Sequence, residues 1–263
     1  MTQKISYRRL LITDCSEENQ DFLVLFDIFR ATLKPDMRFL EFKAYYCSAR
    51  LDYIDATLIV LRGTVIGFCA AAFYATVINK KQYTVGRAAT GILEEHRGHT
   101  LPKWKLYQKY IRYWFRHPFR RTLLSAFVAN PLIYAMICKY TGIAYPRQAA
   151  EPPADIIKIK NDLLRSHNLH RKEGPAFVVE IHFCVSISER ELERIFTSRD
   201  RNVRYFLRIN PKFRQQYGVV VLIPIHLKNI LMSSGRFLYH RGHKIFRSLA
   251  ARFRRRDNID GKK

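Results

Sequence analysis

The sequence has few cysteines, and none of them forms a metal-binding or redox motif. Its five cysteines are an odd number, and no two stand in the Cys-x-x-Cys spacing of zinc sites and redox pairs. We therefore expect a reducing compartment, no disulfide framework and no metal. The cysteines are Cys15, Cys47, Cys69, Cys138 and Cys184.

Long apolar runs are also absent. The first residues lack the apolar core of a secretory signal. The longest apolar stretch, Thr64 to Ile78, has 15 residues, whereas a helix needs roughly 20 to cross a bilayer. No spanning helix is expected, and a cytoplasmic location, either free or at a membrane surface, fits this pattern.

Acidic residues are scarce, and their scarcity is concentrated in two regions. The chain has 46 Lys and Arg against 22 Asp and Glu, a net charge of +24. No carboxylate occurs between Glu95 and Glu151, a segment with ten basic residues, or between Asp200 and Asp257, a segment with fourteen. Such one-signed regions attract phosphates, nucleic acid, anionic lipid or an acidic partner protein.

The length and the apolar content predict a globular protein. With 263 residues, 48% of them hydrophobic and 13% aromatic, the chain can fill one large core or two modest ones. Disordered, collagen-like and disulfide-knot classes are excluded. Residues 148–155 (Q-A-A-E-P-P-A-D) have a linker composition. We expect a domain at 1–147 and a basic α/β extension at 148–263, which either packs on the first sheet or completes it.

Apolar periodicity predicts a mixed α/β fold. In the first half we expect a strand at Leu10–Thr13, a helix starting at Ser16 and stopping before Pro35, and a second helix at Phe39–Tyr46. Three strands then form an antiparallel meander, with glycines suited to bulges in the third. These strands are Thr57–Leu61, Val65–Val77 and Tyr83–Leu93, and the glycines are Gly86 and Gly91.

The region after the meander reads as helix, strand and helix. In the first helix Trp104, Tyr107, Ile111 and Trp114 share an apolar face, and Lys105, Lys109, Arg112 and Arg116 are expected on the solvated face. A strand at Thr122–Ala129 and a helix from Asn130 to Gly142 follow. Farther on we expect strands at Phe177–Ile187, Val203–Ile209 and Val219–Ile225, a helix at Glu189–Phe196, and a helical tail from His226 that is interrupted near Gly235 and Gly242.

The turn before residue 103 has the features of an anion site. A strand that passes through a glycine-containing turn into a helix leaves backbone N–H groups pointing outward, and the helix dipole favours a phosphate there. Arg97, Lys103 and Lys105 add positive charge. The alternative is an ordinary strand-to-helix turn on a basic surface, because a single glycine is a weak motif.

Two segments carry a family resemblance that covers about Tyr7 to Pro146. They are Gly91 to Trp104 (G-I-L-E-E-H-R-G-H-T-L-P-K-W) and Asn130 to Tyr145 (N-P-L-I-Y-A-M-I-C-K-Y-T-G-I-A-Y). With the order of elements, they resemble the GNAT superfamily of acyl-CoA N-acyltransferases. The resemblance implies a GNAT-like mixed, mostly antiparallel central sheet flanked by helices, with acyl-CoA as the donor.

The resemblance also implies a set of residues that bind the cofactor. In the family loop R-G-x-G-x-G/A, Arg97 and Gly98 match, whereas Thr100 and Pro102 replace later small residues and Pro102 removes one N–H donor. Asn130 would lie near the pantetheine arm. The full set is Ile92, Leu93, Arg97, Gly98, His99, Thr100, Leu101, Lys103 and Asn130.

Catalytic residues are harder to assign from the sequence. Family members often place a carboxylate on the strand before the loop, but here Glu94 and Glu95 stand only at its end. The family's general-acid tyrosine falls near Cys138, which makes Tyr134 the favoured candidate and Tyr140 the second. A tyrosine packed in the core of the helix is the competing interpretation of Tyr134.

The function expected is therefore transfer of an acyl group from acyl-CoA, or from an acidic acyl carrier protein, to an amine on a small molecule or protein. The alternative is a catalytically inactive GNAT-like module that binds nucleic acid or an anionic membrane, the latter through the basic amphipathic segment 236–256. No nucleic-acid-binding motif is present. The three histidine pairs lack further metal ligands nearby and are expected to be surface residues: His96/His99, His167/His170 and His240/His243. His96 and His99 flank Arg97, so the alternative for this pair is to bond a nucleotide phosphate or relay a proton.

The assignment of the loop predicts the effect of one charge reversal. Arg97→Glu should weaken the binding of coenzyme A, because it replaces a partner of the diphosphate with a repelling charge. Titration calorimetry of both proteins with coenzyme A measures the difference. Equal affinities would argue against this loop as the phosphate site.

Overall fold

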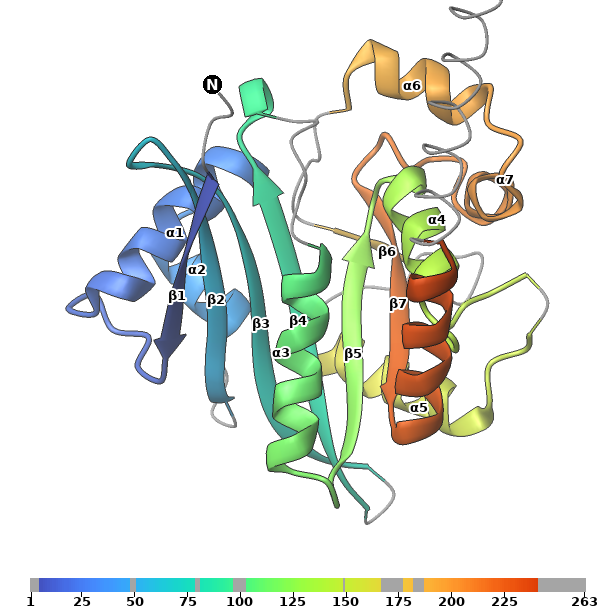
Figure 1. Cartoon of the computed structure of the whole chain (residues 1–263), viewed down its shortest axis with the longest axis horizontal. Helices are drawn as coiled ribbons and strands as arrows, with labels where there is room; N and C mark the ends of the chain where they lie inside the picture. The colour runs from blue at the N-terminus through green and yellow to red at the C-terminus, as the bar shows by residue number, and fades with distance from the viewer. Residues whose placement is uncertain are drawn as a thin grey trace, which may run out of the picture.

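The structure is a computed structural model that describes residues 5–47, 51–78, 81–96, 103–148, 150–166, 177–181 and 187–240. Its centre is a seven-stranded sheet in the order β1-β2-β3-β4-β5-β7-β6. All neighbouring strands are antiparallel except β4 and β5, which are parallel. Helices cover both faces (Figure 1). The mixed, mostly antiparallel sheet flanked by helices confirms the expected fold class.

The first half follows the predicted order. Strand β1 spans Ile5–Ile12, and helices α1 and α2 span Gln20–Leu33 and Phe39–Tyr46. The predicted start of α1 at Ser16 is wrong, because Asn19 caps the helix by accepting a hydrogen bond from the N–H of Phe22. Ser16 instead donates its hydroxyl to Asp14 at 2.6 Å, so its side chain stabilises the preceding turn.

The meander consists of β2 (Leu51–Leu61), β3 (Thr64–Ile78) and β4 (Lys81–Ile92). The turn between β2 and β3 places Arg62 and Gly63 at φ values of 52° and 83°, a conformation that glycine adopts readily. The register of β3 with β4 is continuous, so the bulges predicted in β4 are absent; irregularities occur between β2 and β3 instead. The β4 glycines serve close packing, since a Cβ on Gly86 would lie 2.4 Å from Tyr110.

A short 3₁₀ helix, η1 (Glu94–His96), follows β4, and then α3 (Lys103–Arg116), β5 (Arg121–Val128) and α4 (Pro131–Tyr140) complete the predicted series. Gly86 faces α3, whereas Gly91, an odd number of positions away, faces Thr32 of α1. Helices α1 and α3 therefore cover opposite faces of the sheet (Figure 1).

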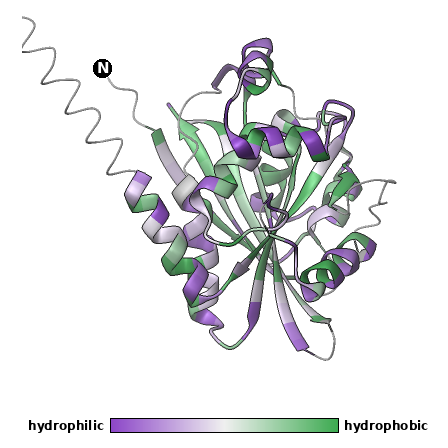
Figure 2. Ribbon diagram, turned by 90° about the vertical axis from the view of Figure 1, so that its right-hand side faces the viewer, coloured by the Kyte–Doolittle hydropathy of each residue, from purple (hydrophilic) through white to green (hydrophobic). Residues whose placement is uncertain are grey.

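The second half extends the same sheet. Strand β7 (Tyr217–Ile225) pairs with β5, and β6 (Val178–Glu180) pairs with β7 at the edge. Helices α5 (Ala154–Ser166), α6 (Glu189–Phe196) and α7 (Arg201–Ile209) surround this part. Residues 227–240 form a further helix, continuous through Gly235, so the predicted interruption there is wrong. Viewed from the side, apolar strands lie between helices whose outer faces are polar (Figure 2).

The strand predicted at Val203–Ile209 is wrong, because this segment is α7. Asp200 caps the helix by accepting from the N–H of Asn202, and Val203 and Phe206 are buried three residues apart. The alternating pattern of R-Y-F-L-R-I suggested a strand, but the cap and the i, i+3 spacing stabilise a helix that packs against α4.

The prediction that the cysteines form no disulfide is wrong. Cys15, which follows β1, and Cys47, which follows α2, form a disulfide. It links two segments of the chain that are 32 positions apart. Cys69 and Cys138 are free and buried. Spacing alone did not reveal the pair because the fold, and not the sequence, brings the two chain segments together.

Candidate functional site

The candidate site lies where β4 and β5 separate. The two strands pair only from Tyr83 to Arg87 on β4 and from Arg121 to Ser125 on β5. At the last pairs, the Ser125 hydroxyl donates to the carbonyl of Gly86 at 3.2 Å. Beyond this point β4 stays paired with β3, and β5 stays paired with β7, so an open wedge remains between the two strands.

A cavity of about 340 Å³ occupies this wedge. Small side chains on both strands leave the space, namely Ala88 and Ala89 on β4 and Ala126 and Ala129 on β5 or just after it. Residues from the surrounding helices form the remaining walls. They include Leu33, Tyr45, Leu106, Tyr107, Asn130, Ile133, Met136, Ile137, Tyr140, Ser233 and Phe237.

The cavity reaches both faces of the sheet. Leu33 of α1 and Tyr45 of α2 line it from one face, and Leu106 and Tyr107 of α3 line it from the other. This passage is possible because β4 and β5 share no backbone hydrogen bonds beyond Arg87. Residues from both faces of the sheet therefore line a single cavity.

The walls are mostly apolar. Among the described residues no Asp, Glu, His, Lys or Arg lines the cavity, and its polar groups are hydroxyls and the Asn130 amide. The free thiol of Cys69 also lines it, and burial raises the pKa of that thiol to about 12. Cys69 is therefore a neutral wall residue at physiological pH and not a nucleophile.

Helix 227–240 closes one side of the cavity through Ser233 and Phe237. Hydrogen bonds hold the helix to the chain after α4: Ser233 accepts from the N–H of Gly142 at 2.9 Å, and Asn229 accepts from the N–H of Ile143 at 2.7 Å. Arg236 donates to the carbonyl of Thr141. These contacts fix the helix as part of the cavity wall.

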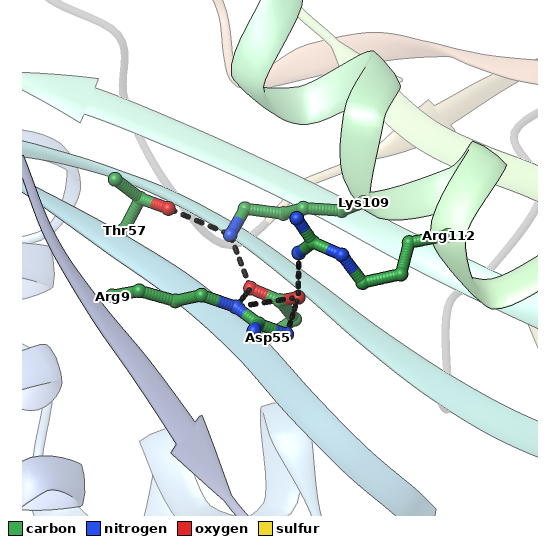
Figure 3. Close-up of polar contacts among 5 residues, drawn as sticks. All are labelled: Arg9, Asp55, Thr57, Lys109 and Arg112. Atoms are coloured by element: carbon green, nitrogen blue, oxygen red, sulfur yellow. Dashed lines mark hydrogen bonds and ion pairs between the residues drawn. The ribbon is translucent and has the colours of Figure 1, made fainter.

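An ion cluster sets the rotation of α3 (Figure 3). Lys109 donates to Asp55 of β2 and to the Thr57 hydroxyl, the latter at 2.7 Å. Arg9 of β1 donates to the same carboxylate at 2.7 Å, and Arg112 adds a weaker contact at 3.4 Å. Both Asp55 and Lys109 are almost fully buried.

This cluster corrects the predicted faces of α3. Lys109 was expected in solvent, but it is buried together with Tyr110 and Tyr113, while Ile111 and Trp114 are only partly buried. A buried lysine is stable only when a carboxylate compensates its charge, and Asp55 lies 54 positions away in sequence. The rotation turns Leu106 and Tyr107 toward the cavity.

The pKa values in the cluster follow from burial and from the neighbouring charges. Burial alone would raise the pKa of Asp55, but the Arg9 hydrogen bond and the Lys109 charge lower it below its usual 3.8. Burial lowers the pKa of Lys109 below 10.5, although Asp55 opposes this change. The Asp55 carboxylate is therefore ionised at neutral pH.

The structure places only part of the predicted cofactor set. Arg97, Gly98, His99, Thr100 and Leu101 lie outside the described residues, and Lys103 begins α3. Asn130 lines the cavity and caps α4, where its Oδ1 accepts from the N–H of Leu132 at 2.8 Å. Ile92 and Leu93 pack into hydrophobic clusters at the end of β4 and are not among the cavity residues.

The three catalytic candidates lie in different surroundings. Tyr134 is fully buried, donates its hydroxyl to the carbonyl of Pro146 at 2.7 Å and packs against Phe206 of α7, outside the cavity. Burial raises its pKa well above the usual range. Tyr140 lines the cavity beside Phe237. Glu94 is exposed in η1 and does not line the cavity.

Several cavity residues were missed from the sequence. Ala88, Thr90 and Ala126 lie in β-rich segments where small residues gave no functional signal. Their signal could have been the run of small side chains on two strands that flank the glycine loop. Ser233 and Phe237 come from a helix about 100 positions beyond α4, so only the fold could reveal them.

The described residues include neither a helix suited to span a membrane nor a cluster of metal ligands. No described helix has both the length and the apolar character required to cross a bilayer. No group of three or more His, Cys, Asp or Glu side chains within the described part of the chain is placed to hold a metal ion.

Comparisons with known proteins give matches only among solved structures. No family model and no curated protein matches the sequence. The GNAT family N-acetyltransferase YhbS from Escherichia coli, solved with CoA, aligns with 52% of this chain and 68% of its own, at 14% identity and a TM-score of 0.36. The NatC complex bound to Gag peptide and CoA aligns with 84% of this chain and 99% of the matched chain, at 13% identity and a TM-score of 0.35.

A third match is a tandem GNAT protein from the clavulanic acid pathway, at 14% identity and a TM-score of 0.31. The match covers 65% of this chain but only 46% of that chain. These likenesses concern the fold, with the GNAT N-acetyltransferases as the recurring class. They show a likeness of fold alone and assign neither a residue nor a substrate.

The ion cluster predicts unequal effects of removing its two central partners. Asp55→Asn leaves Lys109 buried without a carboxylate and should cost about 3 to 5 kcal/mol of unfolding free energy. Lys109→Met should cost less, because Asp55 keeps Arg9 and Arg112. Denaturant titration measures both, with Asp21→Asn as the control, since the Arg8–Asp21 pair is exposed and should contribute less than about 1 kcal/mol.

The pH dependence follows from the lowered pKa of Asp55. Its contribution to stability is complete above the usual value of 3.8 and is lost as the pH falls through the lower folded-state value. Asp55→Asn should therefore flatten the acid limb of the stability curve. An unchanged acid limb, or a larger loss in Lys109→Met than in Asp55→Asn, would contradict this account.

Proposed function

We propose that this protein is an acyltransferase that moves an acyl group from a coenzyme A thioester to an amine. The observation that supports it most is the cavity that passes through the sheet between β4 and β5. A thioester entering from one face and an amine entering from the other would meet inside this passage.

The wedge offers backbone groups to the donor. From Ala88 onward, β4 is paired with β3 along one edge only, because its pairing with β5 ends at Arg87. An extended pantetheine arm carries two amides, which can hydrogen-bond to the open edge in the manner of an added strand. Arg97 and the segment 97–101, which precedes α3 in the sequence, would then hold the diphosphate.

The chemistry needs positioning more than strong acids and bases. The amine nitrogen attacks the thioester carbonyl, a C–N bond forms and the C–S bond breaks. The nitrogen releases one proton to water, and the departing sulfur takes up one proton, so the numbers of protons balance. Because no described carboxylate or imidazole lines the cavity, the amine must arrive neutral, and the apolar walls favour that form. Backbone donors of the wedge would polarise the carbonyl.

Tyr140 is the residue we assign as the proton donor to the departing thiolate. Its side chain lines the cavity, whereas the Tyr134 hydroxyl is engaged by Pro146 on the far side of α4. Glu94 is exposed outside the cavity, so it has no role in this scheme. The acceptor is an amine on a small molecule or a protein, and the net charge of +24 also suits an acidic acyl carrier protein as donor.

If the wedge is the binding site, enlarging an alanine in the wedge should block coenzyme A, and enlarging an alanine elsewhere should not. Ala126→Leu should abolish measurable binding of coenzyme A in calorimetry, because the added side chain fills the passage. Ala154→Leu makes the same change at an exposed position of α5 and should leave binding unchanged. Lack of binding by the unmodified protein at millimolar coenzyme A would disprove the transferase proposal.

The phenylalanine variants of Tyr134 and Tyr140 should differ in kcat. Tyr140→Phe should lower kcat by about 100-fold with little change in thioester affinity, since it removes a proton donor and no binding group. Tyr134→Phe should leave kcat within about twofold and cost about 1 kcal/mol of stability through the lost hydrogen bond. The reverse pattern would return the catalytic role to Tyr134.

A second candidate function is docking to an anionic membrane. Leu227, Leu231 and Leu238 are more than half exposed along helix 227–240, and Phe119, just after α3, is fully exposed. The two helices lie on the same face of the sheet (Figure 1). Exposed basic residues such as Arg116 and Lys228 accompany them, which suits an interface with acidic headgroups.

Vesicle sedimentation tests this docking. The protein should pellet with vesicles that contain phosphatidylserine and remain in solution with phosphatidylcholine alone. The double change Leu231→Glu with Leu238→Glu should abolish pelleting, while Leu40→Glu, an exposed leucine of α2, should not. Equal pelleting of all three proteins would exclude this surface as the membrane contact.

A further inference from the structure

The cavity extends beyond the open wedge. Leu124 of β5 and Ile223 and Ile225 of β7 all line it. Leu124 pairs with Gly86, and Ile225 pairs with Thr122, so these side chains lie beside the part of the sheet where β4 and β5 are closed. A pantetheine arm in the open wedge, at residues 88–92 and 126–130, would leave this deeper part empty.

The deeper part is an apolar chamber with a floor and a roof. Leu124, Ile223 and Ile225 form the floor, and Ser233 and Phe237 of helix 227–240 belong to the roof. No described charged residue lines the chamber. From Ser125, where the wedge closes, to Thr122 the strand advances by about 10 Å, which is room for several methylene groups in line.

The chamber is built into the fold and does not depend on a moving segment. The Asn229 amide donates to the carbonyl of Pro224 at 2.6 Å and to that of Ile143 at 3.0 Å, so the roof helix is fastened to both β7 and the chain after α4. Tyr107 of α3 donates to the carbonyl of Ile230 at 3.2 Å. An apolar space held open in this way reduces stability unless a ligand fills it.

We infer that the chamber binds the hydrocarbon chain of a fatty acyl thioester, so that the preferred donor carries an acyl group much longer than acetyl. This inference rests on the proposed acyl transfer and specifies its donor. The wedge is continuous with the chamber, so a thioester carbonyl at the closing point near Ser125 would direct its chain between the β5–β7 floor and the roof helix. An acetyl group would leave most of that space unfilled.

Calorimetry with a series of thioesters tests the inference. The probes are coenzyme A and its acetyl, butyryl, hexanoyl, octanoyl and decanoyl thioesters, all with the full chain. Each added methylene that enters the chamber should raise the affinity by about fourfold until the space is filled. Equal affinity for the acetyl and octanoyl thioesters would overturn the inference, while binding of coenzyme A itself would leave the transferase proposal intact.

A matched pair of tryptophan variants locates the chain. Ile225→Trp fills the far end of the floor and should reduce octanoyl-CoA affinity at least tenfold, without changing the affinity for coenzyme A or acetyl-CoA. Ile157→Trp makes the same substitution on α5, where the side chain is 38% exposed and does not line the cavity, and should change nothing. Equal losses in both variants would mean that the chain binds on the surface, which overturns the chamber.

The series on the unmodified protein decides the question if Ile225→Trp does not fold. If none of the thioesters binds, both the chamber inference and the proposed acyl transfer fail. If all bind with an affinity that rises with chain length up to a plateau, both are supported.

Discussion

The arrangement of the site depends on one buried charge pair. Asp55 on β2 and Lys109 on α3 are both nearly inaccessible to water. Lys109 can stay buried because Asp55 compensates its charge, and Arg9 supports the same carboxylate. The pair fixes how α3 is rotated about its axis. With Lys109 directed at β2, Tyr110 packs against Gly86 of β4, and Leu106 and Tyr107 reach the cavity.

The cavity lies where β4 and β5 separate, and the rotation of α3 places two of its side chains in the cavity wall. Gly86 allows α3 to lie close to the sheet, and Ser125 closes the vertex through the carbonyl of Gly86. Above the vertex, alanines at positions 88 and 126 leave room where larger side chains would seal the core. The charged cluster lies outside the cavity. Its ion pairs hold α3 against the sheet, and the described residues that line the cavity carry no charge.

Much of the fold was predictable from local signals. The apolar period, Pro35 and the Asn130 cap identified α1, α2 and α4, and the branched residues of 57–61 and 65–77 identified the meander. Contacts that join distant segments were not predictable. The burial of Lys109 depends on Asp55, and the role of Ser233 depends on a helix that packs beside α4. The alternation of apolar and basic residues in α7 is typical of a strand, and the Asp200 cap is what indicates a helix.

The same limit applies to the site. The sequence identified Asn130 and Tyr140, which do line the cavity, because a cap and a helix end have recognisable local patterns. It favoured Tyr134 over Tyr140 because Tyr134 lies one helical turn from Cys138. In the fold Tyr134 contacts Phe206 and Pro146, and Tyr140 lines the cavity. The rotation of a helix about its axis depends on the side chains that pack against it, and the residues next to it in sequence do not determine that rotation.

Strand β7 covers the edge of β5 that does not face β4. It covers seven consecutive residues of β5, from Thr122 to Val128, with backbone pairing. A fragment that ends at residue 147 would expose the unpaired backbone edge of β5, and strands of other molecules could pair with it. The late part of the chain thus shields the early part from self-association, quite apart from what it contributes to ligand binding.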